Sequence, residues 1–343
     1  MELSMIRVAG ALGALLVSLA ILFFAEPLGT WLGVVDYPDH VRKLHARPTP
    51  LVGGIAMTVP LLLWALLGFV WPALTRGGHV PIVPIIVGGV VALIGFLDDR
   101  SPAPALARLL ALLLLTYIVL LLTPQLLPTQ FHWGHLTSTP VAPWLAYPLV
   151  AIGMAGYVNA VNMADGQDGC VIGMFVIWSV CIMLSGGGST ADVALILLLT
   201  GLAVAIFNLQ GKVFLGGPGT YGVPFIFGLL VLQLHNYWGV TGETVMVWFF
   251  LPIVDCLRLM IMRPLQGRSP FDPDRNHFHH RLERFGKNTG LAIYLGLVAS
   301  TSFVAALAPR FAPDCLIVLS ILYLTLMWMT VQSRVPVEAL PPE

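Results

Sequence analysis

The chain has 343 residues, of which 57% are hydrophobic and only 10% are charged, with 17 lysines and arginines against 17 aspartates and glutamates. Soluble domains usually carry about 25% charged residues, so this composition excludes an ordinary water-soluble protein and indicates a membrane protein. A formal net charge of zero gives no reason to expect a polyelectrolyte partner, and we predict no nucleic-acid binding.

Apolar segments recur along the whole chain and are separated by short polar loops. A helix crosses a bilayer with about 20 apolar residues, so the segments predict an all-α, polytopic membrane protein with about eleven transmembrane helices in a single domain, 1–343. The first segment is long enough to remain as a helix, and we predict no cleavable signal peptide. The four cysteines lack metal-ligand spacing and are predicted to be buried hydrophobic side chains. In chain order, the predicted helices cover residues 5–25, 53–72, 80–97, 105–124, 143–161, 169–187, 192–208, 220–235, 241–261, 289–308 and 313–332.

The positive charges divide unevenly between the two sets of loops that these helices define. One set holds only Arg7, Arg76 and Arg310 of the 17 lysines and arginines, which leaves 14 in the other set. Because cytoplasmic loops are rich in lysine and arginine, we predict an N-terminus outside the cell and a cytoplasmic C-terminus. The predicted functional loops are then cytoplasmic. They cover approximately residues 26–52, 98–108, 159–169, 209–220 and 262–288.

The first cytoplasmic loop carries Arg42 and Lys43 ahead of the pair Gly53-Gly54. Arginine offers two parallel donors and glycine lets backbone N–H groups approach, so this loop suits an anionic head group. The alternative is that these charges only set the topology of the chain.

Asp98 and Asp99 end the third predicted helix at the membrane boundary. Adjacent carboxylates are costly there unless they are solvated, paired or bound to a cation. Beside a phosphate they suit Mg²⁺, and one of them could instead be the base that deprotonates a phosphate nucleophile. The alternative is a pair of solvated acids next to Arg100.

Four polar residues, Asn159, Asn162, Asp165 and Asp168, lie where the fifth predicted helix reaches the cytoplasm. The two asparagines are three positions apart and should share a helix face. A glycine follows each aspartate and allows a turn with positive φ that aims the carboxylates back toward that face. A plain turn would not need four polar groups so near the membrane, so this stretch predicts a functional site.

Two further loops have the composition of an anion site. Lys212 precedes the glycine-rich turn 216–219 at the start of a predicted helix, where free N–H groups attract anions, although a simple tight turn is the alternative. In the loop 263–288, Arg275 precedes His277, His279 and His280. Three histidines within four positions form a dense cluster for hydrogen bonding and proton transfer, and without nearby cysteines phosphate recognition suits them better than a transition metal.

In this order, the five stretches resemble the polyprenyl-phosphate N-acetylhexosamine-1-phosphate transferases, a family that includes phospho-N-acetylmuramoyl-pentapeptide transferase. The form His277-Phe-His279-His280 is more similar to the undecaprenyl-phosphate GlcNAc-1-phosphate transferase branch. The resemblance implies that undecaprenyl phosphate attacks the β-phosphate of a UDP-N-acetylhexosamine, giving a polyprenyl-diphospho-sugar and UMP. It also implies a bacterial inner-membrane enzyme that starts a surface glycan such as the O-antigen of lipopolysaccharide, in cell wall biogenesis.

The family roles carry over position by position as implications of the resemblance. The partners would be UDP-N-acetylhexosamine (most simply UDP-GlcNAc), undecaprenyl phosphate and the lipid bilayer, with the oligomeric state left open, a homodimer included. The cofactor would be Mg²⁺ or Mn²⁺, held by Asp99 and Asp168. The catalytic residues would be Asp98, Asp99, Asp165 and Asp168. The substrate-binding residues would be Arg42, Lys43, Asn159, Asn162, Lys212, Arg275, His277, His279 and His280.

The chain departs from the family at Gly217, where the resemblance implies a metal-binding aspartate. Glycine has no carboxylate to offer a cation. Either another acid such as Asp99, Asp165 or Asp168 compensates, or the chain is a catalytically impaired paralogue that binds substrate without turnover. A transporter is a third possibility, but its acids would lie near the middle of the bilayer rather than at helix ends.

Overall fold

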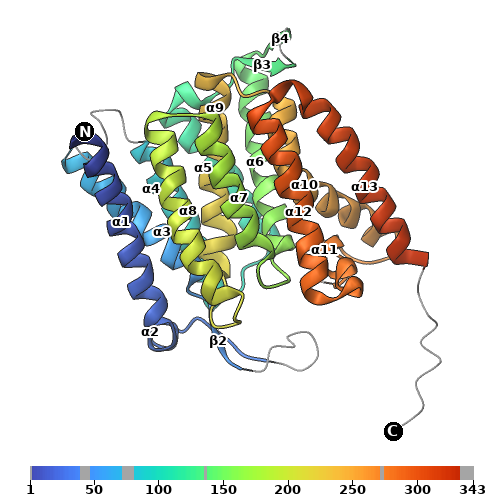
Figure 1. The fold of residues 1–343 in the computed structure, drawn as a ribbon, viewed down its shortest axis with the longest axis horizontal. Coiled ribbons are helices and arrows are strands. Elements are labelled where there is room, and N and C mark those ends of the chain that lie inside the picture. The colour runs from blue at the N-terminus through green and yellow to red at the C-terminus, as the bar shows by residue number, and fades with distance from the viewer. Residues whose placement is uncertain (1, 39–46, 72–80, 135–136, 271–273, 333–343) are drawn as a thin grey trace.

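The apolar segments form helices that lie side by side in an all-α bundle (Figure 1). The structure is a computed structural model that describes residues 2–38, 47–71, 81–134, 137–270 and 274–332. Each helix satisfies its backbone hydrogen bonds internally, which is what allows a segment to cross hydrocarbon. The helices are α1 (Glu2–Phe23), α2 (Ala25–Leu32), α3 (Gly53–Val70), α4 (Ile82–Arg100), α5 (Ala105–Leu122), α6 (Pro143–Ala164), α7 (Cys170–Ser185), α8 (Gly188–Asn208), α9 (Val223–Trp238), α10 (Gly242–Leu265), α11 (Phe278–Leu282), α12 (Lys287–Leu307) and α13 (Ala312–Gln332).

Short elements connect the helices at the two ends of the bundle. Two antiparallel strand pairs are β1 (Val35–Asp36) with β2 (Thr49–Pro50), and β3 (Gln130–Trp133) with β4 (Thr137–Pro140). Figure 1 shows β3 and β4 at one end of the bundle, and β2, α2 and α11 at the other. The remaining elements are the π-helical turn η3 (Pro218–Gly222) and the 3₁₀ turns η2 (Pro124–Leu126), η4 (Glu283–Phe285) and η5 (Pro309–Phe311).

Every predicted segment coincides with a helix, and the ends differ by a few residues. In the described part of the chain, eight helices are long and apolar enough to cross a membrane, and the pair α1–α2, bent by 74°, makes a ninth. The helices α7 and α9 have 16 residues each, fewer than the roughly 20 that a span usually needs. The all-α, multi-pass prediction is confirmed, whereas eleven spans and an outer N-terminus stay predictions.

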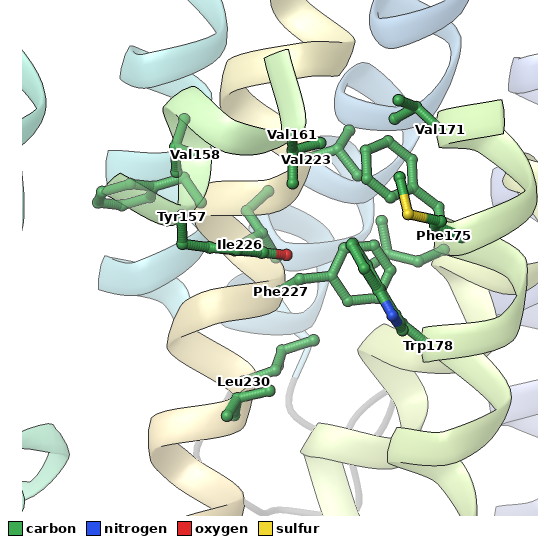
Figure 2. Packing of buried hydrophobic residues seen from close by; sticks show 14 of the residues in the cluster. Tyr157, Val158, Val161, Val171, Phe175, Trp178, Val223, Ile226, Phe227 and Leu230 are labelled. Atoms are coloured by element: carbon green, nitrogen blue, oxygen red, sulfur yellow. The ribbon is translucent and has the colours of Figure 1, made fainter. Parts of the chain in front are cut away.

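Aromatic side chains fill the interior where α6, α7 and α9 meet (Figure 2), and Phe249 of α10 packs against the same cluster. Trp178 of α7 packs edge-on against Phe227 of α9 and Phe249 of α10, with ring centroids 5.9 and 4.8 Å apart. The buried indole N–H of Trp178 donates to the backbone carbonyl of Trp248 at 2.8 Å, so this polar group has a partner inside the core. All four cysteines are buried and unpaired, as predicted.

Glycines let α3 and α4 approach η3 until the backbones touch. A Cβ atom on Gly54 of α3 would overlap the backbone of Gly219, and the Gly54 N–H donates to the carbonyl of Leu215 at 2.8 Å. On α4, a Cβ atom on Gly95 would overlap the backbone of Gly217. These contacts fix η3 against the two helices and therefore determine where the polar residues around it lie.

Asn208, at the end of α8, connects two loops that carry predicted site residues. Its Oδ1 accepts the N–H of Gly169, the residue before α7, at 2.8 Å, and its Nδ2 donates to the carbonyl of Val213 at 3.0 Å. The Asn208 side chain is only 4% exposed. One buried amide therefore holds the end of the loop 159–169 and the turn that leads into η3.

We predict that Asn208→Ala lowers the stability of the protein, because it leaves the Gly169 N–H and the Val213 carbonyl buried without their partner. Each unsatisfied group costs about 1–3 kcal/mol. Thermal unfolding in detergent measures the loss, with Asn236→Ala as the matched control, since the Asn236 amide makes an exposed hydrogen bond to the Gln125 carbonyl. Equal unfolding midpoints for the two variants would contradict the role given to Asn208.

Candidate active site

Three contacts bring four of the five predicted stretches together around η3. Asp99 of α4 contacts Gly217, and Asn162 of α6 contacts Thr220. The turn after α6 contacts the histidines at Gly166. The remaining stretch, which is the first in chain order, carries Arg42 and Lys43. These two residues lie outside the described residues, so their predicted binding role stays a prediction.

The adjacent acids of α4 bind different partners. The two oxygens of Asp98 accept from the N–H of Ala103 at 2.8 Å and from the Arg108 guanidinium of α5 at 2.6 Å. Asp99 accepts the backbone N–H of Gly217 at 2.7 Å through its Oδ2. Three of the four carboxylate oxygens are therefore engaged, and the pair links α4 both to α5 and to η3.

The asparagines of α6 differ in their surroundings. Both atoms of the Asn162 amide contact η3, because its Nδ2 donates to Thr220 Oγ1 at 2.8 Å and its Oδ1 accepts from the Tyr221 hydroxyl at 3.2 Å. The amide of Asn159 lies 3.5 Å from the sulfur of Met163, a weak acceptor. In this structure Asn162 ties α6 to η3, whereas Asn159 keeps most of its hydrogen-bonding capacity.

Asp165 and Asp168 lie in the turn between α6 and α7. Burial, and then the charges of Asp168 and Asp99, raise the pKa of Asp165 from its ordinary 3.8 to about 7. Asp168 is partly exposed and accepts a long contact from the Lys287 ammonium at 3.4 Å. Negative charge therefore gathers near Asp165, where a proton or a cation would be held.

The loop that carries His277, His279 and His280, called the histidine loop below, is anchored by a carboxylate inside α10. Asp255 Oδ2 lies 2.9 Å from His277 Nδ1 and accepts the N–H of Phe278 at 3.0 Å. Its Oδ1 accepts from Arg258 of the same helix at 2.7 Å and from the Tyr323 hydroxyl of α13 at 3.2 Å. Asp255 is not among the residues predicted for the site, although a carboxylate in an apolar helix signals a partner that compensates its charge.

His279 and His280 bring ring nitrogens to the acidic turn. A Cβ atom on Gly166 would lie 2.7 Å from Nε2 of both histidines, so only glycine fits at this position. The His279 side chain is 2% exposed, and its Nε2 has no hydrogen-bond partner among the described residues. Burial, and then the neighbouring His280 and His277, hold the pKa of His279 well below its ordinary value, and burial also lowers the pKa of His280. Both rings are therefore neutral at neutral pH.

The basic residues near these loops differ in their pairing. Arg275 pairs with Glu283 at 2.9 Å and remains half exposed, while the side chain of Lys212 is exposed. Arg263 is buried and donates to Asp274 at 3.1 Å and to the Pro270 carbonyl at 2.7 Å. Burial alone would raise the pKa of Asp274, but the hydrogen bonds from Arg263 and Asn276, together with the charge of Arg263, outweigh burial and hold that pKa below its ordinary value.

The carboxylates near Asp165 have the chemistry of a Mg²⁺ site, although few of them come together. Among the described residues, no three His, Cys, Asp or Glu side chains come together as metal ligands. Mg²⁺ needs only one or two carboxylates when substrate phosphates and waters complete its shell. Burial, and then the charges of Asp168 and Asp99, raise the pKa of Asp165, and the carboxylates of Asp99 and Asp168 offer the oxygen donors that a hard cation prefers.

Backbone atoms fill the space in which a carboxylate at position 217 would begin. A Cβ atom on Gly217 would lie 2.7 Å from Gly95 Cα and closer still to the Gly95 carbonyl group. The Gly217 N–H already donates to Asp99. A side chain at position 217 therefore requires α4 and η3 to move apart.

Comparison with known proteins identifies the family resemblance. Glycosyl transferase family 4 matches residues 82–235, from the start of α4 to the end of α9. A probable undecaprenyl-phosphate N-acetylglucosaminyl 1-phosphate transferase of Bacillus subtilis is 29% identical over 88% of this chain and 85% of its own. A decaprenyl-phosphate N-acetylglucosaminephosphotransferase of Mycolicibacterium smegmatis is 28% identical over 78% of this chain and 74% of its own. An undecaprenyl-phosphate alpha-N-acetylglucosaminyl 1-phosphate transferase of Yersinia pestis is 27% identical over 83% and 79%. The resemblance predicted from the motifs is confirmed.

We predict that Gly217→Ala and Gly217→Asp both destabilise the protein, because either side chain would overlap Gly95. Overpacking of this kind typically costs about 1–3 kcal/mol. Thermal unfolding measures the effect, and Gly296→Ala serves as the control because a Cβ atom on Gly296 meets nothing within 4 Å. A stable Gly217→Asp protein with wild-type unfolding behaviour would show that the predicted steric conflict is absent.

We also predict that acid loosens the histidine loop. Because the pKa of His279 is lower in the folded protein than in the unfolded chain, the unfolded chain binds the proton first. Folding stability is then complete above the ordinary value of 6.5 and falls below it, by at most about 1.4 kcal/mol per pH unit for one such group. Unfolding midpoints at about pH 8 and about pH 5.5 should differ less in His279→Phe than in the wild type, and an equal acid shift in both proteins would refute the assignment.

Proposed function

We propose, on the premise that the chain is a relative of the polyprenyl-phosphate N-acetylglucosamine-1-phosphate transferases, that it transfers N-acetylhexosamine-1-phosphate from a UDP-sugar to a polyprenyl phosphate. The observation that carries the proposal is the meeting of His279 Nε2 and His280 Nε2 at Gly166, next to Asp165. Neutral imidazoles and an acid with a pKa of about 7 can exchange protons at neutral pH. Such groups suit a reaction in which a phosphate becomes a nucleophile.

Phosphoryl transfer needs little covalent chemistry from the protein and depends on positioning and charge stabilisation. In the proposed mechanism, Asp165 takes the proton of the lipid phosphate, and the histidine loop orients the nucleotide sugar. Arg275 and Lys212 are exposed cations that suit the phosphates of the donor. Asp98 and Asp99 hold α4, α5 and η3 in place around the reactants.

The cofactor in this proposal is Mg²⁺ or Mn²⁺, held by Asp99 and Asp168 with Asp165 beside them. When bound, such an ion neutralises the charge of the phosphates and orients them. Asp99 has one carboxylate oxygen outside its bond to Gly217, and Asp168 is partly exposed, so both retain oxygens for a cation. The raised pKa of Asp165 also supports the proposal that a cation binds beside this carboxylate.

The finer assignments are part of the same proposal. The donor is UDP-GlcNAc and the acceptor undecaprenyl phosphate, in the bacterial inner membrane with the polar loops in the cytoplasm. The whole chain forms one catalytic domain, and its product starts a surface glycan such as an O-antigen. The names of the Bacillus and Yersinia relatives support the lipid acceptor and the GlcNAc-1-phosphate group, and the charge of the loops supports their cytoplasmic side.

A second candidate function is substrate binding without turnover, and Gly217 favours it. Position 217 lacks the carboxylate that the family resemblance implies, and the contact with Gly95 closes the space for one. A transporter is disfavoured, because the predicted catalytic acids lie at the ends of α4 and α6. Asp255, inside α10, is already paired with Arg258 and His277.

Purified protein should transfer radiolabelled GlcNAc-1-phosphate from UDP-GlcNAc to undecaprenyl phosphate with Mg²⁺ and not with EDTA. Asp165→Asn and Asp168→Asn should each lower the rate about 100-fold or more, the scale of a positioned acid or base. Asp314→Asn is the matched control, because Asp314 is exposed in the first turn of α13.

The outcomes separate the two candidate functions. Product that forms equally well with Mg²⁺ and with EDTA would refute the cation at Asp99 and Asp168. No product, with UDP-GlcNAc binding still measurable by calorimetry, would favour the impaired paralogue. Neither transfer nor binding would overturn both proposals.

A further inference from the structure

Glu283, in the turn η4 that follows α11, connects two residues of the histidine loop. Its Oε1 lies 2.8 Å from Nδ1 of His280, and its Oε2 accepts from the Arg275 guanidinium at 2.9 Å. Glu283 belongs to none of the sequence motifs. Because His280 and Arg275 are both predicted to bind substrate, the Glu283 carboxylate joins two parts of the proposed binding site.

The contact at Nδ1 determines which nitrogen of His280 carries the proton. A carboxylate accepts hydrogen bonds and cannot donate one, so the neutral ring beside Glu283 carries its hydrogen on Nδ1. Its Nε2 then has a free lone pair, and this atom lies at Gly166, beside Asp165. Burial lowers the pKa of His280 even though Glu283 raises it, which favours this neutral form.

His277, the first histidine of the loop, has a similar carboxylate partner in Asp255. His277 Nδ1 faces Asp255 Oδ2 at 2.9 Å, and the His277 ring stacks on the His279 ring at 5.5 Å and 15°. The His279 ring in turn lies 4.2 Å from that of His280. Asp255 and Glu283 therefore hold the two outer rings of this row of three, in which the His280 ring is tilted by 50° from His279, and the contact with Glu283 limits the rotation of His280.

We propose that Glu283 is a positioning residue that holds His280 in the Nδ1–H form, with Nε2 directed at the Asp165–Gly166 turn as a hydrogen-bond acceptor, and that keeps Arg275 beside the same ring. This inference rests on the proposed function for the use of His280, and on the contacts of Glu283 and Gly166 for its geometry. It specifies what faces Nε2 in the complex: a group that carries a hydrogen, such as a sugar hydroxyl, an amide N–H or a protonated phosphate oxygen. A fully ionised phosphate oxygen would instead require a donor at that position.

Nitrogen NMR of ¹⁵N-histidine-labelled protein in detergent, at a pH where the ring is neutral, tests the tautomer without any turnover. The signals of His280 are those that disappear in His280→Gln. In the wild type and in Glu283→Gln, whose amide oxygen still accepts, Nδ1 should be protonated and Nε2 unprotonated. In Glu283→Ala the proton should move to Nε2 or exchange between the two nitrogens. An Nε2–H signal for His280 in the wild type overturns the inference, even if Glu283→Ala does not fold.

Kinetics supply the second readout. Glu283→Ala should lower kcat about 10-fold to 100-fold, the usual effect of removing the partner that orients a working histidine, with a smaller change in KM. Glu283→Gln should stay within a few-fold of the wild type, and Glu26→Gln, at an exposed position in the first turn of α2, is the matched control.

The possible results keep the two proposals apart. Wild-type kcat together with an unchanged His280 tautomer in Glu283→Ala would overturn the role of Glu283 while transfer itself stands. A wild-type protein without transferase activity would refute the proposed function, and the tautomer measurement would still decide the position of the proton.

Discussion

A carboxylate inside an apolar bundle must have a partner, and the polar end of this protein is organised by that constraint. Asp255 of α10 gathers Arg258, Tyr323 and His277, and in doing so attaches the histidine loop to α10 and α13. Asp98 binds Arg108 and holds α5 against α4. Each acid compensates its burial through a contact with another helix or loop, so the same contacts that lower the electrostatic cost also assemble the site.

Asp165 is different, because no hydrogen bond or ion pair within the described residues compensates its charge. Burial, and then the charges of Asp168 and Asp99, raise its pKa to about 7. Such a group binds a proton weakly at neutral pH and can exchange that proton for a cation. The candidate site therefore combines two paired carboxylates, Asp98 and Asp255, with Asp165, which can bind either a proton or a cation.

Position 217 carries glycine where the family resemblance implies a carboxylate, and its surroundings leave no room for a side chain. Gly217 and Gly95 touch through their backbones, and the Gly217 N–H donates to Asp99. Under the proposed function, the carboxylates of Asp99, Asp165 and Asp168 would therefore have to hold any cation that the substrates bring.

The sequence by itself determined the all-α, multi-pass fold, because the apolar length of a segment is a local property and a helix satisfies its own hydrogen bonds. It also determined which loops are polar and the order of the polar motifs along the chain. Only the tertiary structure decided how the polar side chains pair. Asp255 meets His277 22 positions later, and Asn162 meets Thr220 58 positions later, so no local pattern reveals either contact. Asn162 is predicted to bind substrate, and only the structure shows that its amide contacts η3. Glu283 belongs to no motif, and only the structure shows its contact with His280. Pairing of this kind depends on which helices touch, and that is decided by the packing of glycines and aromatic side chains across the bundle.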